Sequence, residues 1–365
     1  MTGLRQVINA WGTPTPYGVS RSDAAVAQAV AQMLQRHVVM SALQEAVGRA
    51  LVAWSGAEAA CVTHCTASAI TLSVAACMAG QDASRIARLP DAQGLPRKVL
   101  MLTSHQVDYG HAIHQAVRLA GAQPVLADTI DALQRASHEG GVACVLAVES
   151  QLASSSGSQQ TAQLLALARN IGVPLVLDAA AQDWRAAELV ASGADLVLLS
   201  AQKHLRSPTA GLVLGRAALV AAVDAQHRGI GRAMKPTKEA LAGVMAALEC
   251  RAGLSLADWQ VAQQRKVDFV AQAAAGWPGV RVQREADPLG GGFDRLWLAV
   301  DPEVCSVDAS GLVQRLRSGD PVIAVAPHRV AQGLIGLEFS GVDDDELPAL
   351  CSGLAQALRG DSGGL

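Results

Sequence analysis

Aromatic side chains are scarce in this chain of 365 residues: tryptophan, tyrosine and phenylalanine together make up 3% of it, although 50% of the residues are hydrophobic. Alanine, valine, leucine and glycine must therefore pack most of the interior, which suits a parallel sheet in close contact with helices. The chain also lacks an excess of charge of either sign, because its net charge is -3. Without a basic surface field, we expect no nucleic acid among its partners.

Long hydrophobic runs and a paired cysteine pattern are missing as well. No continuous apolar run reaches membrane-spanning length, and residues 1–5 lack the blocks of a signal peptide, so we expect no membrane association. The 7 cysteines are odd in number and scattered, and Cys61 and Cys65 have no second pair at the spacing of a zinc site. We interpret them as reduced core cysteines of a cytoplasmic protein without a metal site.

What the sequence does contain is an alternation of strand-like and helix-like segments over residues 55–237. Helical patterns are expected over 66–80, 109–120, 159–170 and 183–192, and a polar loop over 81–97. Apolar runs of strand length are found at 58–63, 98–102, 124–126, 142–148, 173–177, 194–199 and 211–214. Strands spaced by helices in this way predict a large α/β domain whose mostly parallel sheet is covered by helices.

Three further parts flank this domain. Residues 1–54 are expected to form an N-terminal arm and helices, and the prolines and glycines of the arm exclude a regular helix there. Its Trp11 suggests that the arm lies on another surface, such as a second subunit. Residues 238–273 predict one long linking helix interrupted near Gly253, and residues 274–365 predict a small α+β domain.

Lys203 stands directly after the buried run 194–199, which is an unusual place for a lysine. Burying an ammonium group without a partner costs several kcal/mol or lowers its pKa. One solution is a Schiff base between this amine and an aldehyde cofactor. The other is a side chain that extends from the strand end into solvent. Lys203 alone does not decide between them.

Asp178 and His105 also follow predicted strands directly. In an open parallel sheet, ligands bind outside the carboxyl ends of the strands, so both side chains should lie at the edge that carries Lys203. A carboxylate there can hydrogen-bond a protonated pyridine nitrogen, and an imidazole can stack on a flat cofactor. A helix cap and an ordinary loop histidine are the simpler alternatives.

The turn 64–69 supplies hydroxyl groups and small side chains at the start of a predicted helix. Free backbone N–H groups and the helix dipole favour an anion at such a position, although an ordinary helix cap has the same composition. Thr66 and Ser68 lie in this turn, and Ser200 and Gln202 flank the lysine. Together these four residues can complete a cup for a phosphate group.

With these residues in order, the chain resembles the fold-type I enzymes that depend on pyridoxal phosphate. Within them it is similar to the selenocysteine synthase-like group that includes D-glucosaminate-6-phosphate ammonia-lyase. The matching stretches spread over about residues 1–250, and they are Ile8–Thr13, Gly56–Ala60, His105–Gly110, Val176–Gln182, Lys203–Arg206 and Ile230–Lys235.

The resemblance implies a role for each candidate residue. Lys203 would hold pyridoxal phosphate as a Schiff base, Asp178 would pair with its pyridine nitrogen, and His105 would stack on its ring. The phosphate would be surrounded by Thr66, Ala67, Ser68 and Ser200. Such sites commonly borrow residues across a dimer, with Thr209 as a candidate, so we expect at least a homodimer.

Some stretches depart from the family pattern. Glycines are usual where this chain has His64-Cys65-Thr66, at the two positions before Lys203, and at Ser207. We expect the cofactor cup to survive these changes, which leave the substrate preference open. The chain also lacks the added N-terminal, tRNA-binding region of true selenocysteine synthases, so a tRNA substrate is not expected.

The resulting hypothesis is a lyase that catalyses α,β-elimination with release of ammonia from a β-hydroxy amino acid or an amino sugar acid, which can carry a phosphate. Racemisation, aldol cleavage and transamination share the same carbanion chemistry and stay open. A non-catalytic α/β protein that binds a phosphate ligand is the alternative outside enzymes. Candidates for holding the anionic ends of a substrate are Arg232, Lys235, Lys238 and Arg329.

Overall fold

A computed structural model describes residues 3–108, 110–150 and 157–359. The chain divides into two compact units, a large one formed by Ser22–Gly253 and a small one formed by Met1–Arg21 with Leu254–Leu365. This division differs from the four expected segments. The N-terminal arm belongs to the small unit, whereas the two helices that follow it belong to the large one.

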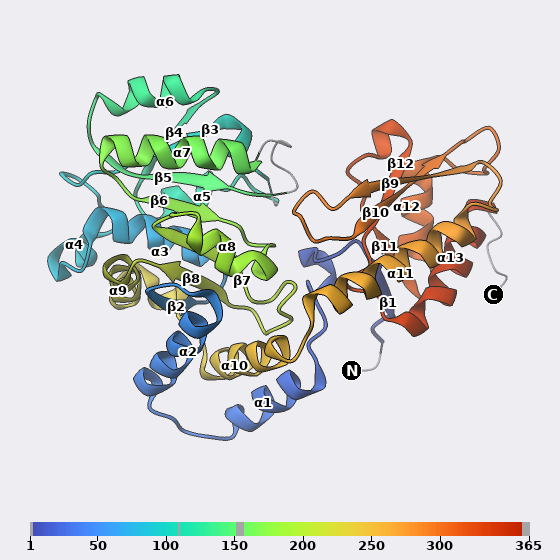
Figure 1. The fold of residues 1–365 in the computed structure, drawn as a ribbon, viewed down its shortest axis with the longest axis horizontal. Helices are drawn as coiled ribbons and strands as arrows, with labels where there is room; N and C mark the ends of the chain where they lie inside the picture. The colour runs from blue at the N-terminus through green and yellow to red at the C-terminus, as the bar shows by residue number, and fades with distance from the viewer. Residues whose placement is uncertain (1–2, 109, 151–156, 360–365) are drawn as a thin grey trace. The chain divides into compact units, whose positions relative to one another are not determined.

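A sheet of seven strands forms the centre of the large unit, in the order β2-β8-β7-β6-β5-β3-β4 (Figure 1). β8 runs antiparallel to both of its neighbours, and every other adjacent pair is parallel. The expected mostly parallel sheet is thereby confirmed, and the carboxyl ends of all strands but β8 lie at one edge. The strands are β2 (Ala59–Thr63), β3 (Lys98–Leu102), β4 (Gln123–Ala127), β5 (Val142–Val148), β6 (Leu175–Asp178), β7 (Leu196–Ser200) and β8 (Gly211–Gly215).

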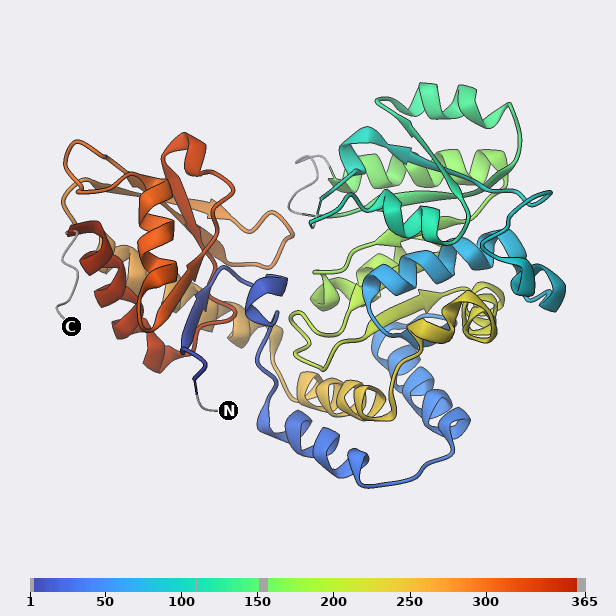
Figure 2. The same ribbon diagram turned by 180° about the vertical axis from the view of Figure 1, so that it is seen from behind.

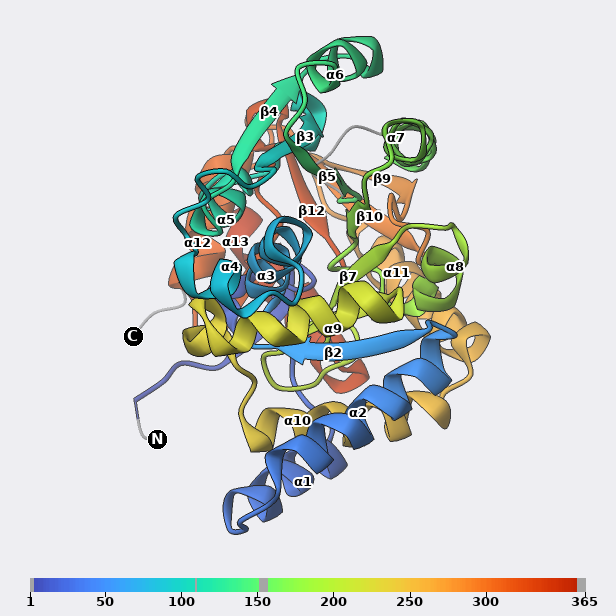
Figure 3. The same cartoon turned by 90° about the vertical axis from the view of Figure 1, so that its left-hand side faces the viewer.

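Helices cover both faces of this sheet. The face toward the viewer in Figure 1 carries α7 and α8, and the view from behind in Figure 2 shows α3 and α5 on the other face. Figure 3 shows β2 between α2 and α9. The helices are α1 (Ala24–Leu34), α2 (Met40–Ser55), α3 (Thr66–Ala79), α4 (Ala83–Arg88), α5 (His114–Leu119), α6 (Ile130–Ser137), α7 (Gly157–Ile171), α8 (Ala186–Ala191), α9 (Ala217–Ala225) and α10 (Lys238–Ala252).

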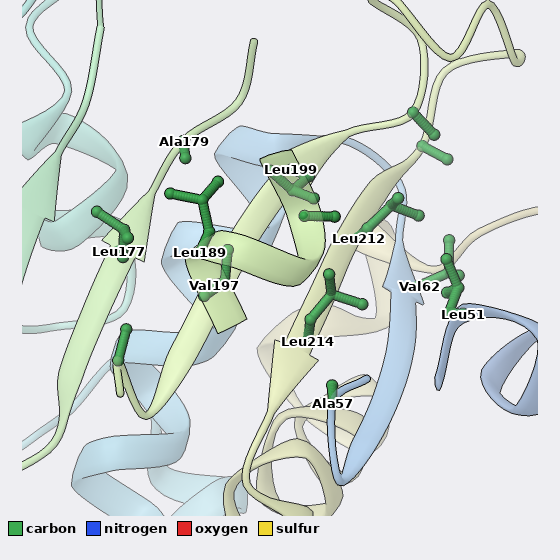
Figure 4. Close-up of a cluster of buried hydrophobic side chains, with 14 of the residues drawn as sticks. Leu51, Ala57, Val62, Leu177, Ala179, Leu189, Val197, Leu199, Leu212 and Leu214 are labelled. Atoms are coloured by element: carbon green, nitrogen blue, oxygen red, sulfur yellow. The ribbon is translucent and has the colours of Figure 1, made fainter. Parts of the chain in front are cut away.

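The two faces build two separate hydrophobic clusters, because successive side chains of a strand point to opposite sides. In β7, Val197 and Leu199 pack into one cluster and Leu196 and Leu198 into the other. Figure 4 shows the first cluster, in which strand side chains meet Leu189 of α8. Burying a leucine contributes about 1.5–3 kcal/mol. A strand buried on both faces, such as β7, therefore fixes firmly the position of the residues that follow it.

Several elements differ from the sequence expectation. The loop expected over 81–97 contains α4, because Asp82 caps it by accepting hydrogen bonds from the backbone of Ser84 and Arg85. The helix α6 was not expected at all, and the Thr129 hydroxyl caps it in the same way. The helix expected over 109–120 is shorter, since α5 begins at His114, and Tyr109 lies outside the described residues.

The small unit combines two sheets with three helices. β1 pairs in parallel with β11, and β12, β10 and β9 form an antiparallel sheet in that order. The N-terminal arm therefore adds a strand to its own chain, and contact of the arm with a second subunit stays a prediction. The elements are β1 (Val7–Ala10), α11 (Leu256–Ala274), β9 (Val280–Ala286), β10 (Asp294–Val300), α12 (Ala309–Ser318), β11 (Val322–Val325), β12 (Leu334–Leu337) and α13 (Leu347–Arg359).

The segment 238–273 forms two helices, α10 and α11, rather than one long linking helix. The first one ends at Ala252, before Gly253, and Ser255 caps the second one. Within the described ranges, no single helix is long and apolar enough to cross a membrane, and only this bent pair passes that test jointly, by length and composition.

Candidate active site

The carboxyl edge of the large unit's sheet gathers most of the predicted site residues. Ser200 at the end of β7 pairs with Gly211, and Gly211 pairs in turn with Thr63 at the end of β2, where α3 begins. On the other side of β7, Asp178 closes β6. The parallel strands thus bring three features to one edge, as the sequence predicted: residues 64–69 (the phosphate turn), residues 201–205 (the lysine turn) and Asp178.

Lys203 lies in the turn after β7 and is surrounded by negative charge. Burial lowers the pKa of its amine, and the carboxylates of Asp178 and Asp183 oppose that effect. Asp178 is 3% exposed, and burial raises its pKa to about 6, against the pull of Lys203 and of a hydrogen bond donated by the Ala180 backbone at 3.2 Å. An amine with a lowered pKa next to buried carboxylates is suited to covalent and proton-transfer chemistry.

His105 is fixed by both ring nitrogens. Nδ1 accepts a hydrogen bond from the backbone N–H of Val148 at 3.0 Å, so the proton must reside on Nε2, which donates to Oε1 of Gln160 at 3.1 Å. Burial lowers the pKa of His105, which keeps the ring neutral. These two bonds fix the plane of the ring and leave its faces to other contacts. The ring exposes none of its surface, so stacking on a cofactor requires a neighbouring group to move.

The phosphate turn has the geometry that an anion needs. The first hydrogen bond inside α3 is donated by Ala69 to the carbonyl of Cys65, so the N–H groups of Thr66, Ala67 and Ser68 precede it. Gly211 allows this turn to approach, because a Cβ there would lie 2.4 Å from the Cys65 carbonyl oxygen. A free N-terminus on a 14-residue helix can hold a phosphate through its N–H groups and its dipole.

Two further predicted cofactor residues lie in the same loop as the lysine. Gln202 and Thr209 are both half-buried between β7 and β8. The loop is tied back on itself, since Ala201 donates to the carbonyl of Ala210 at 3.0 Å and Ser207 donates to that of Ala201 at 2.9 Å. Both residues therefore stand close to the lysine turn in a defined conformation.

The predicted substrate residues are divided between the units. Arg232 and Lys235 are exposed in or beside a 3-10 turn (Ile230–Met234), whose Met234 carbonyl accepts a hydrogen bond from His64 of the phosphate turn at 2.8 Å. Lys238 instead donates to the carbonyls of Leu34 and Arg36, so its ammonium holds the chain after α1.

Arg329 belongs to the small unit. It pairs with Glu285 at 2.7 Å and lies over the ring of Trp297, 3.9 Å from the ring centroid. The guanidinium is thus held by an aromatic face and by an exposed carboxylate that a substrate carboxylate can replace.

Sequence reasoning missed a set of charged residues around the lysine turn. Asp183 and Arg251 form an ion pair of 2.7 Å, and the guanidinium also donates to the carbonyl of His204 at 2.7 Å. Glu149 is buried after β5 and accepts hydrogen bonds from Gln182. Asp183 lies five residues after Asp178, which is a usable signal, whereas nothing local to α10 points from Arg251 to this turn.

The residues present fit pyridoxal phosphate. The site offers the amine of the half-buried Lys203 for its aldehyde, the buried carboxylate of Asp178 for its pyridine nitrogen, and N–H groups at the start of α3 for its phosphate. These groups come from three strand ends of one edge. Among the described residues, no group of three or more histidine, cysteine, aspartate or glutamate side chains is arranged to hold a metal ion.

Comparison with curated proteins finds relatives over nearly the whole chain, although no family model matches it. D-glucosaminate-6-phosphate ammonia lyase of Salmonella typhimurium is 32% identical over 97% of this chain and 96% of its own. A 5'-C-glycyluridine monooxygenase-decarboxylase of a Streptomyces species is 30% identical over 99% of this chain and 92% of its own. An L-seryl-tRNA(Sec) selenium transferase of Solidesulfovibrio magneticus is 26% identical over 54% of this chain.

Solved structures agree with the sequence relatives. The structure of a D-glucosaminate-6-phosphate ammonia-lyase superposes with a TM-score of 0.85 at 31% identity, covering 99% of both chains. A serine palmitoyltransferase of Sphingomonas wittichii superposes with a TM-score of 0.61 at 14% identity, covering 98% of this chain and 88% of its own, which shows a common fold alone.

Proposed function

Because the chain belongs to the D-glucosaminate-6-phosphate ammonia-lyase family and is a fold-type I lyase dependent on pyridoxal phosphate, we propose that it releases ammonia from a phosphorylated amino sugar acid. One observation carries this proposal: the match to an ammonia-lyase extends over nearly the full length of both chains. The half-buried Lys203, on whose amine the buried carboxylates of Asp178 and Asp183 act, supports it.

The cofactor would be held by the residues of the carboxyl edge. We assign covalent attachment to Lys203, the pyridine nitrogen to Asp178, and one face of the ring to His105. The phosphate is assigned to Thr66, Ala67, Ser68 and Ser200, with Gln202 and Thr209 beside them. When bound, pyridoxal phosphate supplies an electron sink for the bond that breaks at the α-carbon of the substrate.

The protein residues then handle protons and charge. We assign removal of the α-proton to the Lys203 amine, whose pKa burial lowers, because a lowered pKa favours the neutral form that can take a proton. Asp178, whose pKa is about 6, is ionised there and can balance a protonated pyridine nitrogen. Loss of the β-hydroxyl as water, followed by hydrolysis, consumes the water again, so the net products are a 2-keto-3-deoxy acid and ammonia.

The anionic ends of the substrate fall to arginine and lysine side chains. Arg232 and Lys235 are exposed and stand beside the phosphate turn, so we assign the substrate phosphate to them. Arg329 is assigned the α-carboxylate, in exchange for Glu285. Lys238 is left out because two carbonyls already occupy its ammonium.

The test is an assay on purified protein loaded with pyridoxal phosphate. With D-glucosaminate 6-phosphate as substrate, keto acid and ammonia should appear in equal amounts, and Lys203→Ala should produce neither. A racemised, cleaved or transaminated product would replace elimination by one of the related reactions. Binding of the cofactor without turnover of any amino acid would instead indicate a non-catalytic role.

A second candidate function has one observation in its favour, the similarity to the Streptomyces monooxygenase-decarboxylase at nearly the same identity. An enzyme of that kind consumes oxygen and releases carbon dioxide, whereas an ammonia-lyase neither consumes oxygen nor releases carbon dioxide. Turnover at the same rate in air and under nitrogen supports the lyase. Oxygen uptake in proportion to product favours the second candidate.

We also propose a cytoplasmic homodimer. All 7 cysteines carry free thiols, which suits a reducing compartment. Leu34, Val39 and Met40, at the end of α1 and the start of α2, are large apolar side chains that stay exposed in the single chain. Light scattering should give twice the mass of the chain, and a monomer at micromolar concentration would contradict the proposal.

A further inference from the structure

Asp183 has a buried carboxylate, and only one of its two oxygens accepts a hydrogen bond among the described residues. It opens the 3-10 turn Asp183–Arg185 and is 1% exposed. Oδ2 accepts the ion-pair hydrogen bond from Arg251, whereas Oδ1 is buried and has no hydrogen-bond partner within residues 3–108, 110–150 and 157–359. A buried acceptor without a partner typically costs about 1–3 kcal/mol. This cost would be removed by a donor that hydrogen-bonds Oδ1 of Asp183 during only part of the catalytic cycle.

The carboxylate is fastened to the turn that carries Lys203. Arg251 bonds both Asp183 and the carbonyl of His204, so one guanidinium joins the two segments. A second contact joins the same two segments, because the rings of Trp184 and His204 meet edge to face with centroids 4.4 Å apart. Asp183 is therefore held at a fixed place beside the lysine turn.

The charges around the lysine show which group this carboxylate serves. Asp178 at the end of β6 and Asp183 both act on the Lys203 amine, and Arg251 of α10 and Lys203 both act on Asp183. Under the proposed function, Asp178 faces the pyridine nitrogen of the cofactor. Asp183 is then the carboxylate left for the amine whenever it is not attached to the cofactor.

We propose that Asp183 is a positioning residue for Lys203, whose Oδ1 accepts the lysine ammonium when the amine carries a proton, while Arg251 holds the carboxylate and the lysine turn together. The inference rests on Lys203 being the cofactor lysine, and it deepens the proposed function. After Lys203 has taken the proton from the substrate, its ammonium group would be hydrogen-bonded to Asp183 until the proton is released. In this assignment the carboxylate acts through Lys203 and not on the cofactor or the substrate.

The test measures the Lys203 amine directly. In the full-length chain without cofactor, competitive acetylation followed by peptide mass spectrometry gives the pKa of each lysine, with the exposed Lys235 as internal reference. Asp183→Asn keeps the acceptor for Arg251 and removes the charge, so the Lys203 titration should move down by about 1 pH unit. Asp287→Asn in the small unit, a matched change in another buried pair, should leave it in place.

A second variant separates the carboxylate from its arginine. In Asp183→Asn with Arg251→Gln the pair becomes neutral, so no uncompensated guanidinium remains. If Asp183 serves the lysine, the titration stays below that of the wild type, and this variant also carries the test if the single one does not fold. An unmoved titration in the single variant, or a wild-type titration in the double one, overturns the inference. Neither measurement needs turnover, so a failed ammonia assay leaves the result readable.

Discussion

Each unit contains a buried aspartate–arginine pair, and the two pairs differ in how completely the carboxylate is used. In the small unit, Oδ1 of Asp287 accepts from Arg295 at 2.7 and 2.6 Å and Oδ2 accepts from the backbone of Leu289 and Gly291. In the large unit, Oδ2 of Asp183 accepts from Arg251, and Oδ1 has no hydrogen-bond partner among the residues that the structure describes. Both oxygens of Asp287 accept hydrogen bonds, so this carboxylate stabilises a local loop. Asp183 has one oxygen that can still accept a hydrogen bond from a group whose charge changes, such as a lysine amine.

One lysine in each unit, the buried Lys266 and the half-buried Lys203, shows the same difference. Lys266 of α11 donates to the carbonyl of Val342 at 2.6 Å and lies 3.8 Å from Asp344, so it completes a local structure. Lys203 stands between Asp178 and Asp183 at the edge of the sheet. Buried charge in the small unit is therefore structural, and in the large unit it surrounds the proposed chemistry.

The largest effect should come from exchanging the two lysines for methionine. Lys203→Met removes both the attachment point and the base, so kcat/KM should fall about 10³-fold or more while the melting temperature changes little. Lys266→Met should lower the melting temperature and leave activity per folded molecule near that of the wild type. If both variants lose activity equally at full stability, the contrast between the units is wrong.

The second test breaks the arginine of each pair. Arg295→Met leaves Asp287 as a buried, uncompensated charge and should cost about 3–5 kcal/mol of unfolding free energy in denaturant titration. Arg251→Met should cost less, because Lys203 remains beside Asp183 as a second cation. Equal losses would mean that the lysine does not compensate Asp183.

The pH dependence of the unfolding free energy tests the buried carboxylate of Asp178. Its pKa is about 6 in the folded chain against an ordinary 3.8, so the folded state binds the proton more tightly and ionisation opposes folding. The contribution is present at low pH and lost as pH rises through about 6. Without cofactor, Asp178→Asn should match the wild type at about pH 4 and exceed its unfolding free energy by roughly 3 kcal/mol at about pH 7. A constant difference at all pH values would contradict the assignment.

The smallest effect concerns which arginine holds which end of the substrate. Arg232→Gln should raise KM for a phosphorylated substrate about tenfold with kcat unchanged, and should leave an unphosphorylated analogue unaffected. Arg329→Gln should raise KM for both, because both carry the α-carboxylate. The reverse pattern in steady-state kinetics would exchange the two assignments.

The sheet and its edge were predictable because they follow from local patterns. The runs that became β5, β6 and β7 are strand-length and apolar, and parallel strands must end at one edge, which brings Asp178 and Lys203 together. The family and the cofactor, inferred from motifs around these residues, are confirmed by the ammonia-lyase relatives. The roles of the individual site residues stay predictions until the variants are measured.

The rest depended on contacts that no local pattern carries. Arg251 lies on α10. The spacing of apolar residues in this helix predicts which face is buried, but it does not predict which turn the guanidinium of Arg251 contacts. The strand β1 finds its partner in β11, near the other end of the chain, and the arm alone could not indicate that pairing. Short helices such as α4 depend on one capping side chain, a signal easily missed inside a polar segment.

The pairing of β1 with β11 also sets an order on biosynthesis. The large unit is one continuous segment, Ser22–Gly253, and can fold as soon as it has left the ribosome. The four residues of β1 are made first, yet their partner strand begins at Val322 and is made near the end. β1 therefore has no partner strand through most of translation. It is still unpaired when the large unit has been completed at Gly253.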